Sequence, residues 1–369
     1  MDVRLAPETD PRRADVRRFL ESNPDPAPPE LAAAGLVSPR WPRPWGMDAD
    51  LETALIIDQE LRKAGVDPHA HNPIGIGWAG PTILFAGTEV QKRRLLPPLL
   101  DGSEFWCQLF SEPAAGSDLA SLATSAVRDG DVYVVNGQKV WNTYAERADY
   151  GILLARTDPT APKHRGISYF LCPMDLPGIE VRPIVQMTGD QGFCEVFFTD
   201  VRIPAGLRLG DEGQGWALAK HTLGNERLSL SSGGVLWGQG PRTVDLIERL
   251  AGQADPLRRD RAVRLYAEAE VLRMLGLRQV SREMAGGGPG PEVAVRKYLA
   301  DRHGQRVMNL AVDAMGPAGM LAGQGRDGPD PDDVWYWGFL YSRALTIGGG
   351  TTQVLSDIIA ELILGLPKT

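Results

Sequence analysis

The pattern of hydrophobic and polar residues changes twice along the 369-residue chain. Up to about residue 100, apolar residues recur at helical spacing, interrupted by a proline-rich stretch over residues 23–45. Residues 105–200 instead contain short runs that are rich in β-branched and aromatic residues. After Gly210 the helical spacing returns and continues to the end of the chain. The pattern therefore predicts helices, then strands, then helices again.

Individual elements follow from the same pattern. We expect helices at residues 51–64, 89–100, 213–231, 240–252, 258–285, 291–314, 332–345 and 352–364. We expect strands around Ala126, 132–135 and Val140, and at 150–155, 167–172, 179–184 and 194–198. Asp129-Gly130 and Asn136-Gly137 are typical of hairpin turns, so we expect the chain to reverse at both places.

This order of elements predicts an α+β multidomain fold. We expect an N-terminal helical domain at residues 1–104 and a central β-barrel or sandwich at 105–210. A C-terminal helical domain, similar to a four-helix bundle, is expected at 211–369.

Composition narrows the class of protein. The formal net charge of −8 disfavours nucleic acid and anionic membrane surfaces as partners. No run approaches the roughly 18 consecutive apolar residues of a membrane span, and the amino terminus lacks the apolar core of a signal peptide. The three cysteines are few and widely spaced, and the five histidines show no metal-ligand spacing beyond His69-x-His71, which is more typical of a surface pair in a loop. We therefore expect a cytoplasmic protein with reduced thiols and no metal centre.

Two short segments carry candidate chemistry. The segment 110–121 (FSEPAAGSDLAS) is rich in small residues and hydroxyls, which allow a backbone to approach a ligand closely. By itself it reads equally well as a capped loop between two elements. Further along, Trp141 and Thr143 end a predicted strand and offer a flat face and a hydroxyl, which suit a planar heterocycle. Alone, a tryptophan at this place is more often part of a core.

Together these segments resemble the flavin-binding signature of the acyl-CoA dehydrogenase family. The resemblance extends over nearly the whole chain and includes residues 81–83, 87–92 and 197–204. It implies FAD as cofactor, with Ser111 bound to the flavin ring, Ser117 on the pyrophosphate side, Trp141 against the ring and Thr143 towards its reactive N5 edge. The full set of cofactor-binding residues implied by the resemblance is Phe110, Ser111, Gly116, Ser117, Trp141, Thr143, Thr351 and Gln353.

The catalytic base does not stand where many relatives have it. Their glutamate precedes a Gly-Thr pair near the carboxyl end, and the matching residue here is Gly349. Isovaleryl-type and bacterial steroid-side-chain enzymes supply the glutamate from an earlier helix, before an arginine, and Glu226-Arg227 matches that place. On a helical projection this pair flanks an apolar stripe. The resemblance implies Glu226 as base and Arg227 as its support; the alternative is that the two side chains simply form an ion pair.

Three consecutive glycines, Gly348–Gly350, precede the last predicted helix, and we call them the glycine run. Thr351 or Thr352 is a plausible N-cap, and a helix start after glycines presents free backbone N–H groups. The resemblance implies that the N–H of Gly349 binds the thioester oxygen, whereas a flexible turn is the alternative.

The implied function is the oxidation of an acyl thioester, carried by coenzyme A or acyl carrier protein, to the enoyl thioester (an EC 1.3-type reaction). Electrons would pass to an electron-transfer flavoprotein, and the chain would form a homodimer or homotetramer, with a mixed tetramer as the alternative. Two other functions stay open: a flavin-dependent monooxygenase or oxidase of the same fold, and a non-catalytic partner subunit. Residues 248–262 lack the Arg-x-x-Phe-Gly element with which many relatives grip FAD, so the contacts of its adenine end are undefined.

Overall fold

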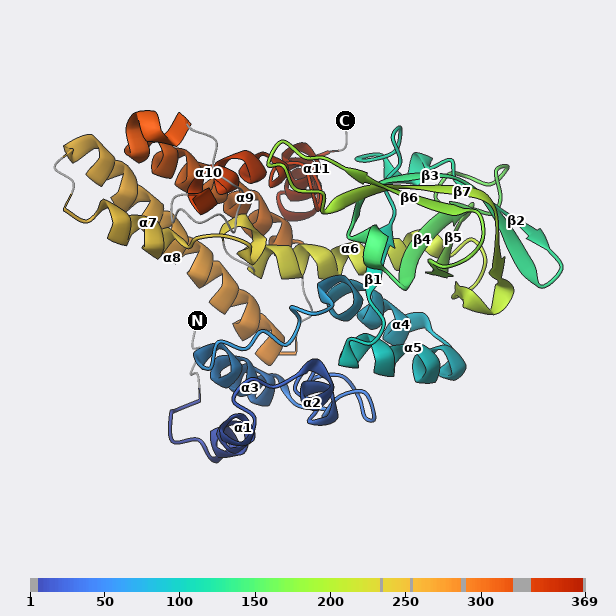
Figure 1. Ribbon diagram of the computed structural model, residues 1–369, viewed down its shortest axis with the longest axis horizontal. Helices are drawn as coiled ribbons and strands as arrows, with labels where there is room; N and C mark the ends of the chain where they lie inside the picture. The colour runs from blue at the N-terminus through green and yellow to red at the C-terminus, as the bar shows by residue number, and fades with distance from the viewer. Residues whose placement is uncertain (1–5, 233–234, 253–254, 287–289, 321–332, 368–369) are drawn as a thin grey trace. The chain divides into compact units, whose positions relative to one another are not determined.

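The computed structural model describes residues 6–232, 235–252, 255–286, 290–320 and 333–367 (Figure 1). The chain divides into two compact units. We call Arg4–Ile184 with Gln191–Asn225 the sheet unit, and Met1–Val3, Val185–Asp190 and Glu226–Thr369 the helical unit. Within the described residues, no helix is both long and apolar enough to cross a membrane.

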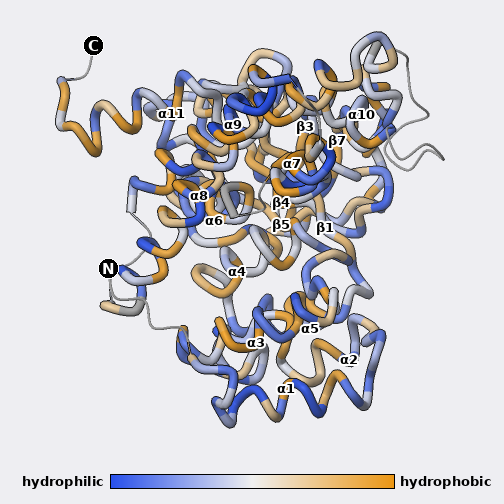
Figure 2. The backbone as a smooth tube through the Cα atoms, turned by 90° about the vertical axis from the view of Figure 1, so that its left-hand side faces the viewer, coloured by the Kyte–Doolittle hydropathy of each residue, from blue (hydrophilic) through white to orange (hydrophobic). Residues whose placement is uncertain are grey.

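The sheet unit begins with helices. They are α1 (Pro11–Ser22), α2 (Pro28–Ala33), α3 (Leu51–Lys63), a π-helical turn (Gly75–Ala79), α4 (Gly80–Ala86) and α5 (Glu89–Asp101). Helix α3 starts where the Asp50 side chain accepts the N–H of Thr53, and α5 ends at the left-handed Gly102. The helices predicted at 51–64 and 89–100 are thus confirmed. Hydrophilic residues dominate α1, with few hydrophobic ones between them (Figure 2).

The strands of the sheet unit form one open sheet. They are β1 (Trp106–Leu109), β2 (Ser125–Asp129), β3 (Val132–Thr143), β4 (Tyr150–Arg156), β5 (Ile167–Pro173), β6 (Ile179–Ile184), β7 (Phe193–Pro204) and β8 (Arg208–Leu209). Their order is β6-β7-β3-β2-β4-β5-β8, and β1 pairs in parallel with β4. Because β6 and β8 end the order without pairing to each other, the sheet resembles a sandwich rather than a closed barrel.

One of the two predicted hairpin turns is wrong. Asp129-Gly130 does lie at the turn between β2 and β3, but β3 runs straight through Asn136-Gly137. The pairing of β3 with β7 shifts there, between Val135 and Gly137, as in a β-bulge. A Cβ on Gly137 would stand 2.7 Å from the Cα of Thr124, so glycine serves close backbone approach rather than chain reversal.

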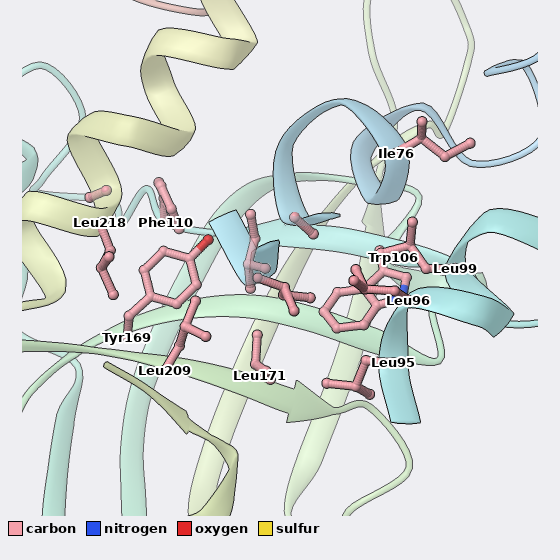
Figure 3. Close-up of a cluster of buried hydrophobic side chains, with 14 of the residues drawn as sticks. Ile76, Leu95, Leu96, Leu99, Trp106, Phe110, Tyr169, Leu171, Leu209 and Leu218 are labelled. Atoms are coloured by element: carbon pink, nitrogen blue, oxygen red, sulfur yellow. The ribbon is translucent and has the colours of Figure 1, made fainter. Parts of the chain in front are cut away.

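Two apolar clusters fill the sheet unit. One joins the N-terminal helices to the sheet, and Figure 3 shows Leu95, Leu96 and Leu99 of α5 around the Trp106 side chain. In the same cluster Tyr169 lies beside Phe110, edge-on at a centroid distance of 5.8 Å. The second cluster contains Cys107, Cys172 and Cys194, which are buried free thiols as the sequence predicted. Phe110, at the start of the candidate flavin loop, is therefore anchored in a core.

The helical unit contains the remaining long helices. They are the end of α6 (Gly215–Ser232), then α7 (Thr243–Leu250), α8 (Pro256–Met284), α9 (Glu292–Met315), α10 (Asp333–Tyr341) and α11 (Thr352–Ile358), which a π-helical turn (Ile359–Ile363) extends. Helices α8 and α9 lie side by side (Figure 1). Residue 332, the expected start of the helix at 332–345, lies outside the described residues. The predicted fold class of helices, strands and helices is confirmed, whereas the three domain boundaries stay a prediction.

Candidate active site

The loop that follows β1 is tied to strand β3. Phe110 is buried, and the carbonyl oxygen of the next residue, Ser111, accepts a hydrogen bond of 2.9 Å from the N–H of Val140. Glu112 and Ala115 exchange backbone hydrogen bonds of 3.1 and 3.0 Å, which close a tight turn. The structure therefore brings Ser111 next to the strand residues that precede Trp141.

A buried ion pair supports this loop. Lys139 has 0% of its surface exposed, and its Nζ donates to the Glu112 carboxylate at 2.8 Å and to the Phe110 carbonyl at 3.0 Å. Glu112 also accepts the N–H groups of Ala123 at 2.6 Å and Thr124 at 2.9 Å. Burial lowers the pKa of Lys139 to about 8, although Glu112 opposes this shift. Burial would raise the pKa of Glu112, but the Lys139 charge and these hydrogen bonds outweigh it and lower that pKa.

Trp141 has an unusual backbone and an unusual exposure. Its φ of 63° lies in the left-handed region, which bulky residues rarely adopt, and 59% of its surface is exposed. It sits at a second pairing shift of β3 with β7, between Lys139 and Asn142. The aromatic ring of Phe193 contacts it edge-on, at a centroid distance of 6.2 Å. A strained bulge that presents a large aromatic face to the surface is typical of a ligand contact.

Four further candidate flavin contacts of the sheet unit are at least partly exposed to solvent. Gly116 and Ser117 are exposed, and Ser111 and Thr143 are half-buried. A Cβ added to Gly116 would meet nothing within 4 Å, so the loop leaves space for a ligand there. The flat indole face and these hydroxyls are groups that fit a flavin.

In the helical unit, Glu226 and the glycine run come together. Glu226 lies on α6 with 6% of its surface exposed. Gly349 has a φ of 65°, and a Cβ at that residue would stand 3.3 Å from Oε1 of Glu226. The same point is 2.5 Å from Cδ1 of Leu230 and 2.9 Å from Cε of Lys297. A side chain at 349 would therefore require Leu230 and Lys297 to shift on a backbone that favours glycine, and the carboxylate of Glu226 lies close to the point where that side chain would begin.

The remaining candidate residues of the helical unit are Arg227, Thr351 and Gln353. Arg227 is half-buried; burial lowers its pKa, and the Glu226 charge acts in the opposite direction. Of the two N-cap residues that the sequence suggested, Thr351 is the N-cap of α11, and its hydroxyl accepts the N–H of Val354 at 3.2 Å. Gln353 is exposed in the first turn of α11.

Sequence reasoning missed three residues behind the glycine run. Lys297 donates to the Gly348 carbonyl at 2.9 Å and to Asp301 at 2.7 Å. The indole N–H of Trp237 donates to the other Asp301 oxygen at 3.3 Å. One signal was available, because Lys297 and Asp301 stand four residues apart on the face of α9 that also carries Val293, Ala294, Gly304 and Met308. Charged residues are rarely fully buried unless they are paired.

Comparison with known proteins identifies the chain. Family models of acyl-CoA dehydrogenases match it in three stretches: the N-terminal domain at residues 5–103, the middle domain at 107–201 and the C-terminal domain at 213–364. Acyl-CoA dehydrogenase IpdE1 of Mycobacterium tuberculosis is 40% identical over 343 residues, 92% of this chain and 86% of that protein. The chain belongs to the acyl-CoA dehydrogenase family.

Two further members of the acyl-CoA dehydrogenase family extend this likeness. Acyl-CoA dehydrogenase FadE34 of M. tuberculosis is 41% identical over 340 residues, which are 92% of this chain but 46% of that protein, so the chain spans about half of its length. The solved structure called Tcur3481-Tcur3483 steroid ACAD is similar with a TM-score of 0.82 and 28% identity, over 100% of both chains. Acyl-CoA dehydrogenases are flavoproteins that oxidise acyl thioesters with FAD, and the chain is an oxidoreductase of this class.

Proposed function

We propose that this chain oxidises an acyl-CoA to its enoyl-CoA, with Glu226 as the catalytic base and the backbone N–H of Gly349 as the donor to the thioester oxygen. The supporting observation is the place of Glu226. Its carboxylate lies 3.3 Å from the point where a side chain of residue 349 would start, and that residue is a glycine. The Glu226 carboxylate would thus reach, from α6, the position that many relatives supply with a glutamate at the residue matching 349.

The chemistry requires a base and a donor together. A proton next to a thioester carbonyl is only weakly acidic unless the negative charge that develops on the oxygen is stabilised. Glu226 takes this proton, and Gly349, which has no side chain of its own, offers its backbone N–H. A bound FAD would supply the acceptor for the hydrogen that leaves the neighbouring carbon with its electron pair, so that the double bond can form. Arg227 contributes a positive charge that interacts with the Glu226 carboxylate.

For FAD itself, we propose the residues that the family resemblance implies. Phe110, Ser111, Gly116, Ser117, Trp141 and Thr143 of the sheet unit, with Thr351 and Gln353 of the helical unit, would hold it. The exposed, left-handed Trp141 beside the anchored loop supports this assignment. FAD content, measured by the ratio of flavin to protein absorbance, tests it in single alanine variants of Trp141 and Ser117.

We propose coenzyme A as thiol carrier, because IpdE1 and FadE34 are named as acyl-CoA dehydrogenases. As electron acceptor we propose an electron-transfer flavoprotein, which the family resemblance implies. The similar solved structure is called Tcur3481-Tcur3483 steroid ACAD, a name that contains two protein names and the word steroid. We therefore propose a bulky, steroid-type acyl group and an assembly either of identical chains, as a homodimer or homotetramer, or with a related chain in a mixed tetramer. Light scattering of the purified chain separates the first assembly from the second.

Substitution of Glu226 by glutamine tests the proposed base. Because the amide cannot take the proton, anaerobic flavin reduction by a good thioester falls by at least about 100-fold. FAD content stays the same. The matched control is Glu248→Gln, which makes the same change on an exposed carboxylate of α7 and leaves reduction unaltered. Wild-type reduction rates in Glu226→Gln refute the assignment.

The substrate class is tested by bleaching of the flavin absorbance with a panel of thioesters. Butyryl-, isovaleryl-, octanoyl- and steroid-side-chain acyl groups, each on coenzyme A and on acyl carrier protein, cover the proposed and alternative substrates. Fastest bleaching by the steroid-type CoA thioester supports the proposal. Rapid reoxidation by air, in place of transfer to an electron-transfer flavoprotein, favours the oxidase alternative instead.

A further inference from the structure

Lys297 is a fully buried cation that the proposed chemistry does not use directly. Its three donated hydrogen bonds go to Asp301 at 2.7 Å, the Gly348 carbonyl at 2.9 Å and the Leu345 carbonyl at 3.5 Å. Burial of an ammonium group is unfavourable unless it is paired and hydrogen-bonded. Two of its three acceptors belong to the backbone segment that leads into the glycine run, although Lys297 is about 50 residues distant in sequence.

The glycine run packs directly on this network. A Cβ on Gly348 would stand 2.8 Å from Cη2 of Trp237, and one on Gly349 would stand 2.9 Å from Cε of Lys297. The Trp237 N–H binds Asp301, and the Lys297 ammonium lies 5.5 Å from the centre of the Trp237 ring. Trp237, Asp301 and Lys297 therefore form one connected support behind residues 348 and 349.

The backbone that carries Trp237 is strained. Leu236 and Trp237 are consecutive non-glycine residues in the left-handed region, with φ of 53° and 54°. Such conformations persist only where the surrounding structure holds them, and they gather at functional sites. This backbone conformation places the Trp237 ring next to Gly348 and allows the indole N–H to donate to Asp301.

We propose that Lys297 is a positioning residue that orients and polarises the peptide group between Gly348 and Gly349. The carbonyl of Gly348 and the N–H of Gly349 belong to the same planar peptide group and point in opposite directions. An ammonium group bound to the carbonyl therefore fixes the direction of the N–H. It also draws electron density towards the carbonyl oxygen, which makes the N–H a stronger donor to the thioester. This inference rests on the proposed role of Gly349.

Three variants of the FAD-loaded enzyme separate this role from a purely structural one. Lys297→Met removes the charge and all three bonds, and Lys297→Gln keeps a neutral donor near the Gly348 carbonyl. Lys220→Met is the matched control, because Lys220 is exposed on α6. FAD content and the thermal melting curve establish that each variant is folded and loaded.

The first measurement is anaerobic flavin reduction by the best thioester of the panel. In Lys297→Met the limiting rate falls about 100-fold, because the misdirected donor acts mainly on the transition state. The half-saturating thioester concentration stays within about threefold of wild type. Lys297→Gln gives an intermediate rate, and Lys220→Met matches wild type.

The second measurement is independent of turnover. The infrared band of the enoyl-CoA product, labelled with ¹³C at its carbonyl, shifts to lower frequency when strong donors bind the oxygen. We expect the full shift in wild type and Lys220→Met, and a smaller one in Lys297→Met. A full shift and a wild-type rate in Lys297→Met overturn the inference. If Glu226→Gln also retains the wild-type rate, the proposed function fails with it; if Glu226→Gln is inactive, only the role of Lys297 is lost.

Discussion

The two units each bury one lysine–carboxylate pair, and the two pairs behave differently. Lys139 meets Glu112 at 2.8 Å in the sheet unit, and Lys297 meets Asp301 at 2.7 Å in the helical unit, with both lysines 0% exposed. Yet the pKa of Glu112 is lowered, whereas burial raises the pKa of Asp301 to about 6. Distance and burial of the lysine therefore do not decide the protonation of the carboxylate.

The difference follows from the burial of each carboxylate, which is greater for Asp301, and from the other donors around it. Glu112 accepts two backbone N–H groups in addition to Lys139, at 2.6 and 2.9 Å. Asp301 accepts only a longer bond of 3.3 Å from the indole of Trp237 besides that of Lys297, among the described contacts. Hydrogen bonds to the charged form replace lost hydration, so Glu112 stays firmly ionised while Asp301 remains close to protonation.

Removal of each lysine is the strongest test of this contrast. Lys139→Met leaves Glu112 as a buried charge and lowers the free energy of unfolding by about 3–5 kcal/mol. Lys297→Met costs about 1–2 kcal/mol at pH 7, because Asp301 takes up a proton and avoids an unpaired charge. Urea unfolding of the two apoproteins measures both values. Equal losses contradict the explanation.

The pH dependence of stability gives the next largest effect. Because the pKa of Asp301 rises from 3.8 to about 6 on folding, the folded protein binds this proton more tightly than the unfolded chain. The free energy of unfolding therefore falls as pH rises from about 4 to 6. Relative to Asp301→Asn, wild type loses about 2–3 kcal/mol over that range.

The corresponding variant of the other pair has the opposite sign. Folding lowers the pKa of Glu112, so its contribution is present above its ordinary pKa of 4.5 and is lost as pH falls. Relative to Glu112→Gln, wild type therefore gains stability as pH rises. Urea unfolding at several pH values measures both slopes, and slopes of the same sign would show that the donor count is not the cause.

The smallest effect on stability concerns Trp141, two residues after Lys139 on the same strand. Its ring is largely exposed and its backbone is left-handed, a conformation that asparagine tolerates. Trp141→Asn is expected to change the free energy of unfolding by less than about 0.5 kcal/mol, while FAD content falls clearly. Normal FAD content in this variant argues against the flavin contact; a large loss of stability argues that the indole is structural.

Much of the fold could be predicted from the sequence, because periodicity and capping are local. The helices at 51–64 and 89–100 and the Thr351 cap are confirmed for that reason. Asn136-Gly137 misled the prediction, since the same dipeptide that favours a turn also suits a bulge where Gly137 meets the backbone of Thr124. The outcome depended on a neighbouring strand, which local pattern does not specify.

In the candidate site, too, a local motif could be predicted, whereas a contact between distant segments could not. Glu226 was predicted from a short motif, and its approach to Gly349 is consistent with that choice. Lys297 was missed because its partner carbonyl, at Gly348, lies on a distant segment of the chain. A helical pattern registers a charged residue on an apolar face, but it does not show which backbone group satisfies that charge.

The crowding around Gly349 has an evolutionary consequence. A glutamate at that residue would adopt a left-handed backbone that favours glycine, and its first carbon would require Leu230 and Lys297 to shift. A carboxylate at residue 349 and the present packing of Leu230 and Lys297 therefore exclude each other unless these neighbours change together. Under the proposed assignment of Glu226, descendants of this chain would retain the carboxylate on α6.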